Sequence, residues 1–503
     1  MSPFCWPVRQ SSGLSNAVAD PQTHQVDAAS AERAPTLDAE RIFPSFGSFF
    51  YTLMALAAAI WVVLVGSAIP AVGDTKLGII GFACGTVIGT ALVVCSVALP
   101  AFRYGIDSID ISKASLGIRG SGIALVGLIV MGIGWAGVAL ALVARGSATL
   151  FANMGGDHGD VDERLVVAIA LLLIPLFYLL VRHGLDAIRR VNQLAGPALL
   201  ILACVSLALL WRRYGSDNLM QQNVPADQAL TTDRLKAFAY AMEFGVTMAL
   251  SWWPYMGGLY RFLRYRRHAV GPAILGGSLI GTTLSASVAA LATVHLGSPD
   301  PVVWLVALTG PAIGPVLVGI VLLLSIPAIC LLLYFVASAA QQLRSLARTP
   351  WNARVIVALA PLALVGFNTS WTLAHVVTVA TFGSLVFISI CGIVLADFWV
   401  LRRGRIDLPH IFVDGVEGHY WYKVGVNWAA MLTIAAGCAA YLYLYDPISL
   451  SARTAFRYAG AALPVMTGSA LLYLLLMKLA PKSRDVERQG QASPEGAIVR
   501  VGL

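Results

Sequence analysis

Residues 240–258 read YAMEFGVTMALSWWPYMGG, an apolar stretch that carries one acidic side chain and ends in a proline followed by two glycines. A proline removes one backbone hydrogen bond from a helix, and the paired glycines Gly257 and Gly258 loosen the helix further. We therefore predict a membrane-spanning helix over residues 235–257 that breaks in its second half, near Pro254. Helices broken near the bilayer midplane, in corresponding positions of two halves of a chain, are typical of secondary-transporter binding sites.

The composition of the whole chain supports a membrane location for this stretch. Of the 503 residues, 58% are apolar and 12% are charged, about half of the ~25% charged residues of soluble domains. A hydrocarbon core about 30 Å thick needs ~20 mostly apolar residues for each helical crossing. We predict an all-α polytopic membrane protein with twelve spans, at residues 47–70, 76–100, 119–147, 163–182, 190–211, 235–257, 268–296, 311–343, 353–371, 374–401, 422–445 and 455–479.

The distribution of basic residues predicts the orientation. Loops after even-numbered spans carry more Lys and Arg than loops after odd-numbered spans, which predicts that both termini face the cytoplasm from a plasma membrane. Residues 1–45 lack the basic region and apolar run of a signal peptide, and we expect a disordered cytoplasmic tail there. No predicted loop is long enough for a soluble domain, which leaves a transporter, a channel or an intramembrane enzyme.

Glu243 is the clearest candidate for a functional group at membrane depth. It shares one helical face with Tyr240, Thr247 and Ser251, because these positions recur at spacings of three and four. A charged side chain in this environment costs at least ~2.5–3.5 kcal/mol, so it indicates function by default. The alternative is that Glu243 bonds to a neighbouring helix and that Pro254 only kinks its own.

The first span is the expected counterpart of the span at 235–257 in an inverted repeat. Its interruption signal is weaker, because Gly66, Ser67 and Pro70 lie in its outer half, whereas its centre reads AAAIW at residues 57–61. The sequence alone does not establish the repeat.

The third span contains GIGWAG at residues 132–137. Its tryptophan, Trp135, offers a flat face on which a planar ligand can stack. The same pattern also occurs in ordinary helix packing, because small residues let two helices approach closely.

Other polar groups favour structural roles. Asp397 lies close to Arg402, Arg403 and Arg405, which predicts an ion pair at the membrane interface. The seven cysteines have no Cys-x-x-Cys spacing and predict neither a disulfide framework nor a metal site. His295 and His375 stand alone. The chain has no His-Glu-x-x-His or Gly-x-Ser-x-Gly motif, so we expect no enzyme, no metal and no nucleic-acid partner.

Taken in order, several stretches resemble the nucleobase:cation symporter-1 family, which includes cytosine, purine, allantoin and hydantoin permeases. The stretches are YGIDSIDISKASLGIRGS at 104–121, GWAG at 134–137, WWPYMGGLYRF at 252–262, ADFWVLRRGRID at 396–407 and GVNWA at 425–429. The resemblance implies a five-plus-five inverted-repeat core at 46–402, two additional helices at 403–480 and a cytoplasmic tail at 481–503. It also implies alternating access in a chain that functions as a monomer in the lipid bilayer.

The resemblance further implies a planar heterocycle held between Trp135 and Trp252. A second alignment would put the latter aromatic at Ala249 instead of Trp252. The remaining substrate-binding candidates are Gly134, Thr247, Ser251 and Ser325.

The chain differs from the family at several positions whose side chains form hydrogen bonds with the substrate in family members. The family glutamine of the third span is replaced by Gly132 or Ala139, and the family aspartate after the sixth-span proline is Gly258. Residues 325–334 read SIPAICLLLY, without the family Asn and Ser/Thr pair. Because polar partners provide most of the discrimination in a buried site, the substrate stays open.

The function that we expect is import of a small planar heterocycle without any cofactor besides a coupling cation. A proton carried by Glu243 is preferred to sodium, because the eighth span offers mainly Ser325 as a hard oxygen ligand. The alternatives are a divergent transporter of another small organic solute and a non-transporting membrane sensor.

Overall fold

The computed structural model describes residues 35–154 and 161–479, so the predicted tail at 481–503 and most of the tail at 1–45 lie outside the described residues. The first half of the described chain is built almost entirely of helices. Its α-helices are α2 (Phe46–Ala57), α3 (Ile60–Ser67), α4 (Thr75–Val93), α5 (Leu99–Tyr104), α6 (Ser108–Leu116), α7 (Gly122–Met154), α8 (Glu163–Val181), α9 (Gly184–Leu219), α10 (Arg234–Leu250) and α11 (Trp253–Tyr260). Short 3-10 or π segments are η1 (Asp38–Glu40), η2 (Ile69–Val72) and η3 (Val94–Ala98).

The second half continues this pattern and adds one small hairpin. Its helices are η4 (Arg266–His268), η5 (Pro272–Leu284), α12 (Ser285–Leu296), α13 (Pro301–Ala340), α14 (Trp351–Phe367), α15 (Thr369–Ala374), α16 (Val376–Leu395), η6 (Ala396–Leu401), η7 (Pro409–Ile411), α17 (Trp428–Leu444), α18 (Phe456–Ala459) and α19 (Ala462–Leu479). The strands β1 (Tyr445–Asp446) and β2 (Ser451–Ala452) pair antiparallel between α17 and α18.

The described residues contain eight helices that are long and apolar enough to cross a membrane, or nine if the bent pair α2 and α3 forms one span. Two shorter apolar helices, α14 and α17, accompany them. Each of the twelve predicted ranges contains a helix. The prediction of a helical polytopic membrane protein therefore agrees with the structure.

The predicted break in the sixth span is present. Helix α10 ends at Leu250, the chain turns at Ser251 and Trp252, and α11 begins at Trp253 with Pro254 in its first turn. A proline is tolerated there because the first N–H groups of a helix have no partner inside the helix.

The first span is also broken, but not where its glycine, serine and proline suggested. The helix stops at Ala58, Ala59 is extended with φ −64° and ψ 167°, and α3 restarts at Ile60. The two segments are bent by 52°. The break therefore falls in the alanine-rich centre of the span, whereas Gly66 and Ser67 lie within α3.

Glycines hold α10 tightly against α4. A Cβ at Gly85 would lie 2.1 Å from the carbonyl oxygen of Met242, and a Cβ at Gly245 would lie 2.4 Å from that of Phe82. Small residues at helix interfaces let two backbones touch in this way. This contact fixes α10, and with it the start of the break, relative to α4.

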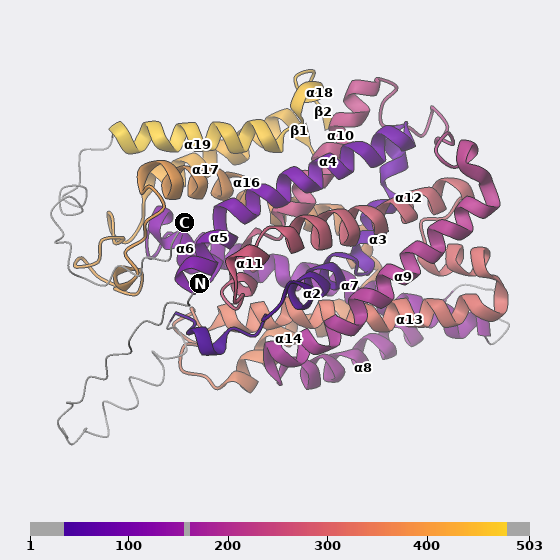
Figure 1. The fold of residues 1–503 in the computed structure, drawn as a ribbon, viewed down its shortest axis with the longest axis horizontal. Coiled ribbons are helices and arrows are strands. Elements are labelled where there is room, and N and C mark those ends of the chain that lie inside the picture. Colours follow the sequence, from indigo (N-terminus) through magenta and orange to yellow (C-terminus); the bar gives the residue numbers. More distant parts are fainter. Residues whose placement is uncertain (1–34, 155–160, 480–503) are drawn as a thin grey trace, which may run out of the picture. The chain divides into compact units, whose positions relative to one another are not determined.

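Two further groups of helices surround the breaks. Helix α7 packs along α13 and also contacts α3 and α11. Helices α16, α17 and α19 pack against one another (Figure 1). Residues 36–45 also pack onto this framework, since Phe43 is fully buried and its N–H donates to the carbonyl of Phe262 at 3.2 Å.

Candidate functional site

The two helix breaks meet through a pair of tryptophans. Trp61, the second residue of α3, and Trp252, at the end of the α10 break, have ring centroids 5.8 Å apart and planes inclined by 52°. Trp61 is buried, and Trp252 is partly buried. The ring of Trp252 also meets Tyr255 edge to face, with centroids 5.8 Å apart. The breaks thus place three aromatic rings at one point of the structure.

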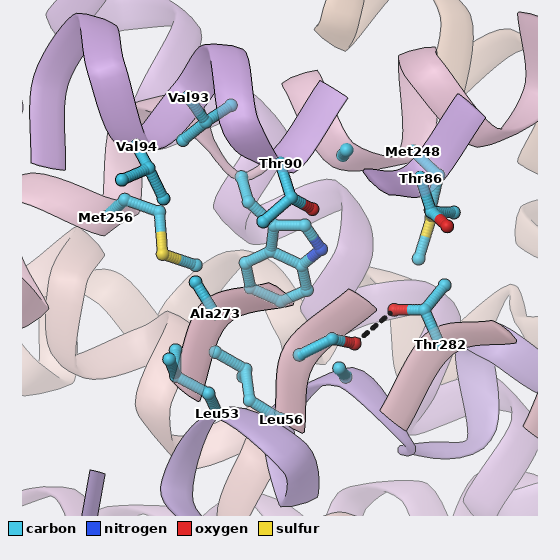
Figure 2. A pocket seen from close by; sticks show the side chains of 14 residues that line it. Leu53, Leu56, Thr86, Thr90, Val93, Val94, Met248, Met256, Ala273 and Thr282 are labelled. Carbon is cyan, nitrogen blue, oxygen red and sulfur yellow. Dashed lines mark hydrogen bonds between the residues drawn. The ribbon is translucent and has the colours of Figure 1, made fainter. Parts of the chain in front are cut away.

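A pocket lies beside Trp252. Its walls come from α2, α4, η3, α10, α11 and η5, so it borders both broken spans and the two helices that follow them (Figure 2). Apolar side chains dominate the lining: Leu53, Leu56, Val93, Val94, Met248, Met256 and Ala273. An apolar lining of this kind suits a small, largely apolar or planar molecule.

Three threonine hydroxyls supply the polar part of the lining. Thr282 donates to the carbonyl of Gly277 at 3.0 Å (Figure 2). Thr86 bonds to Thr283 at 3.0 Å and to Ala83 at 3.0 Å. The hydroxyl of Thr90 has no hydrogen-bond partner among the described residues, so it is available to a ligand. The cavity therefore offers few fixed polar contacts.

Trp135 lies on α7, which contacts both α3 and α11. Its ring is buried, and its indole N–H has no hydrogen-bond partner among the described residues. Trp135 does not belong to the lining of the cavity beside Trp252, and neither does its neighbour Gly134. The structure places Trp135 on a helix next to the breaks without stacking it against Trp252.

The two hydroxyl groups of the sixth span that we predicted to bind substrate donate hydrogen bonds within their own helix. Thr247 donates to the carbonyl of Glu243 at 2.8 Å, and Ser251 donates to that of Met248 at 2.6 Å. Each oxygen keeps lone pairs that can accept, but the proton of each hydroxyl is already committed.

Ser325 of α13 contacts the other break. Its hydroxyl donates to Val321 at 2.9 Å and accepts the N–H of Ile60 at 3.3 Å. Ile60 is the first residue of α3, whose first N–H groups have no partner inside the helix. Ser325 therefore caps the restarted helix of the first span.

Glu243 is buried and bonds to another helix. Its carboxylate accepts the N–H of Ala461 at 2.8 Å and that of Ala462 at 3.0 and 3.1 Å. These amides form the start of α19, where the helix dipole favours negative charge. Glu243 is not part of the cavity lining, because α10 contributes Met248 and Ala249 there.

The predicted ion pair of Asp397 is confirmed. Nε of Arg402 lies 2.6 Å from the carboxylate of Asp397, whose side chain is buried, and the side chain of Arg402 is 11% exposed. Tyr473 of α19 donates to the second carboxylate oxygen at 2.9 Å, while Arg402 also reaches the carbonyl of Ala114 at 2.7 Å. The pair therefore joins η6, α6 and α19.

Packing explains why the family's polar residues are missing from two positions. A Cβ at Gly132 would lie 2.4 Å from Cγ2 of Val336, and a Cβ at Gly258 would lie 2.8 Å from the ring of Phe335. Helix α13 fills the space that a glutamine or an aspartate needs.

Sequence reasoning did not identify Trp61 or the cavity threonines. Trp61 is one of many apolar residues in its span. Only its position directly after the break distinguishes it from the others, and the sequence did not predict that break. Thr86 and Thr90 recur at a spacing of four on α4, a face that nothing in the sequence connects to Trp252.

Comparisons with known proteins agree with this geometry. Residues 45–476 match a family described as permease for cytosine/purines, uracil, thiamine, allantoin. The allantoin permease of Saccharomyces cerevisiae is 33% identical over 101 residues, which are 18% of this chain and 16% of that permease. The chain thus matches only a small part of the length of that curated relative.

Two solved structures of Mhp1 share the fold. The inward-facing conformation has a TM-score of 0.70 at 18% identity and covers 96% of this chain and 100% of its own. The closed conformation with bromovinylhydantoin bound has a TM-score of 0.68 at 19% identity, and the match covers 91% of this chain and 98% of that structure. The fold is that of a polytopic helical membrane protein of the Mhp1 type. The chain belongs to the family of permeases for cytosine and purines, uracil, thiamine and allantoin.

Proposed function

We propose that this permease is a secondary-active importer of a small planar heterocycle such as a nucleobase, allantoin or a hydantoin, coupled to a cation by alternating access. The observation that carries the proposal is the meeting of both helix breaks at Trp61 and Trp252, beside a pocket with a mainly apolar lining. The proposed architecture is twelve spans in a five-plus-five inverted repeat with two further helices, acting as a monomer in the plasma membrane with cytoplasmic termini.

Stacking supplies most of the proposed affinity. Trp252 presents a ring at the cavity, and aromatic pairs contribute about 0.5–1.5 kcal/mol beyond the area that they bury. Thr90 offers a free hydroxyl. Trp135 and Gly134 would join the site when α7 and the broken helices move relative to each other during the transport cycle.

The proposed coupling ion is a proton at Glu243. The ionised carboxylate accepts three amide hydrogen bonds from the start of α19. A protonated carboxyl carries a donor on one oxygen, and that donor cannot face an N–H group. Protonation would therefore remove at least one of these bonds and weaken the contact between α19 and α10, which would link the proton to a movement of helices.

Sodium at the first break is the alternative. Ser325 already donates one hydrogen bond and accepts another, which leaves one lone pair for a cation. Backbone carbonyls at Ala58 and Ala59 would have to supply the remaining oxygen ligands.

Ligand binding is tested by the thermal unfolding of the detergent-purified protein. Nucleobases, allantoin, hydantoins and amino acids are screened with and without sodium, because a bound ligand raises apparent stability. We expect stabilisation by a planar heterocycle that is lost in Trp252→Ala and in Trp135→Ala. Trp211→Ala is the matched control, because Trp211 is exposed on α9. Stabilisation by amino acids alone would favour another organic solute as the substrate.

Coupling is tested by uptake of the ligand into proteoliposomes. We expect uptake to follow an imposed pH gradient and Glu243→Gln to abolish that dependence. Uptake that does not depend on the pH gradient and is unchanged in Glu243→Gln would exclude proton coupling at Glu243. Uptake driven by a sodium gradient would then be compared in the wild type and Ser325→Ala. Binding without any uptake would favour a sensor.

A further inference from the structure

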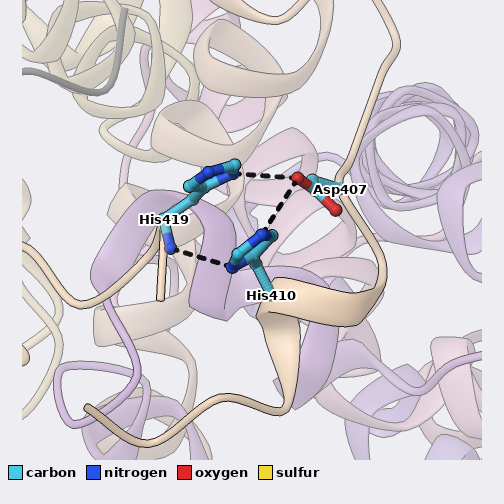
Figure 3. Close-up of side chains that lie close together, drawn as sticks. All are labelled: Asp407, His410 and His419. Carbon is cyan, nitrogen blue, oxygen red and sulfur yellow. Dashed lines mark hydrogen bonds and ion pairs between the residues drawn. The ribbon is translucent and has the colours of Figure 1, made fainter. Parts of the chain in front are cut away.

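Three metal-binding side chains meet in the connection between η6 and α17. The Nδ1 atom of His419 lies 2.8 Å, and the Nε2 atom of His410 lies 3.7 Å, from the same carboxylate oxygen of Asp407 (Figure 3). The three ligand atoms lie within 4.8 Å of one another. All three side chains are half-buried, with 22–35% of their surface exposed, so an ion from solution can reach them.

The local backbone holds the three residues in place. The 3-10 turn η7 puts Asp407 and His410 three residues apart at its start. The N–H of Asp407 donates to the hydroxyl of the buried Tyr420 at 2.8 Å, which fixes Asp407 to the segment that carries His419. The imidazole rings of His410 and His419 stack with centroids 3.6 Å apart.

The two distances to the carboxylate of Asp407 lie near those between the ligands of a tetrahedral metal ion. Zinc binds nitrogen and oxygen at about 2.0–2.1 Å, so neighbouring ligand atoms lie about 3.3 Å apart. The observed 2.8 and 3.7 Å fall on either side of this value. The Nδ1 atom of His419 is buried and lies 2.8 Å from the carboxylate of Asp407 without the alignment of a hydrogen bond.

We propose that Asp407, His410 and His419 form a binding site for a divalent transition metal ion, with zinc as the first choice. Two imidazoles and one carboxylate suit zinc, whereas calcium and magnesium prefer oxygen ligands only. Three protein ligands leave a fourth position for water. The bound ion would connect η7 to the segment that leads into α17.

Two existing contacts must change when the ion binds. The stacked rings of His410 and His419 turn so that both nitrogens point at the ion, and one hydrogen bond is lost. The Nδ1 atom of His410 accepts the backbone N–H of His419 at 3.4 Å, so the neutral ring carries its proton on Nε2. Coordination through Nε2 moves that proton to Nδ1 and breaks this long hydrogen bond. The cost is that of one weak hydrogen bond and of the ring stacking, against two new metal–nitrogen bonds and one metal–oxygen bond.

The site is tested on the full-length protein, purified without a histidine tag and stripped of metal with a chelator. Zinc chloride is titrated against a fluorescent zinc indicator. We expect one zinc per chain, with affinity reduced at least about tenfold in Asp407→Asn and in His419→Gln. His183→Gln is the matched control, because His183 is exposed and far along the chain, and it should bind zinc as the wild type does.

A second measurement needs no variant. Cobalt(II) in the wild-type protein should give the intense visible absorption of a four-coordinate site, and zinc should displace it. Weak absorption of a six-coordinate ion would overturn the proposal. The proposal would also be overturned if the wild type did not bind zinc, or if Asp407→Asn and His419→Gln bound zinc as the wild type does. An equal loss of zinc binding in His183→Gln would overturn it too. Thermal unfolding of each variant without metal identifies any loss that comes from misfolding.

Discussion

The hydroxyl of Ser325 accepts the backbone N–H of Ile60 at 3.3 Å and donates to the carbonyl of Val321 at 2.9 Å. This contact joins the middle of α13 to the first residue of α3, across 265 positions of the chain. Ser325 is fully buried, so water cannot replace it. The break in the first span therefore depends on a side chain from a distant helix.

We expect Ser325→Ala to destabilise the protein by about 1–3 kcal/mol, because it leaves the buried N–H of Ile60 without an acceptor. The thermal unfolding of the purified protein, followed by tryptophan fluorescence, measures the change. The control is Ser67→Ala, since the hydroxyl of Ser67 bonds only to Leu64 within its own helix, and its effect should stay within about 0.5 kcal/mol. Equal effects of the two substitutions would refute a capping role for Ser325.

Gly85→Ala should separate α4 from α10. The added Cβ would lie 2.1 Å from the carbonyl of Met242 and 2.9 Å from the N–H of Val246, and neither backbone atom can move aside alone. Overpacking of this kind costs about 1–3 kcal/mol, so we expect a lower melting temperature. Gly468→Ala is the control, because nothing lies within 4 Å of its Cβ position; this change in α19 should be neutral or stabilising.

Local chemistry explains why one break could be predicted and the other could not. Pro254 cannot continue a helix in the usual way, so the sequence around it predicts the end of α10. Ala58 and Ala59 belong to the residue type that most favours helix. Nothing near them in the sequence indicates a break, because the partner of the freed amide is Ser325 in α13.

The same distinction holds for the polar residues. The ion pair of Asp397 and Arg402 spans five positions and was predictable from the sequence. The amides of Ala461 and Ala462 that bind Glu243 lie more than 200 positions away. His410 and His419 meet Asp407 only because the chain between them turns back, a feature that their spacing does not reveal.

Asp397→Asn should be among the most damaging single changes in the protein. It leaves the guanidinium of Arg402 buried without its negative partner, which costs about 3–5 kcal/mol. The matched control is Asp414→Asn, because Asp414 pairs with Arg344 at 3.1 Å on the exposed surface, where such pairs contribute at most about 1 kcal/mol. Expression level and thermal unfolding report both effects, and comparable losses in the two variants would contradict a structural role for the buried pair.

Asp107, in the connection between α5 and α6, predicts a pH dependence of stability. Its carboxylate accepts the N–H of Asp110 at 2.9 Å and the side-chain amide of Gln342 at 3.1 Å. Burial raises the pKa of Asp107 to about 6, and the charge of Asp110 adds to the effect. The N–H of Asp110 and the charges of Arg261 and Lys113 act in the opposite direction.

Because the pKa of Asp107 is higher in the folded protein than in the unfolded chain, the folded state binds the proton more tightly. The stabilisation is fully present below about pH 4 and disappears as the pH rises through about 6. We expect the difference in unfolding free energy between the wild type and Asp107→Asn to fall by up to about 3 kcal/mol between pH 4 and pH 7. Asp446→Asn is the control, because hydrogen bonds from Ser449 and Ile448 lower the pKa of Asp446. Its stabilisation is present above pH 4 and is lost only at lower pH, so its difference from the wild type should stay constant over the same range. A constant difference for Asp107→Asn as well would show that folding does not raise the pKa of this carboxyl.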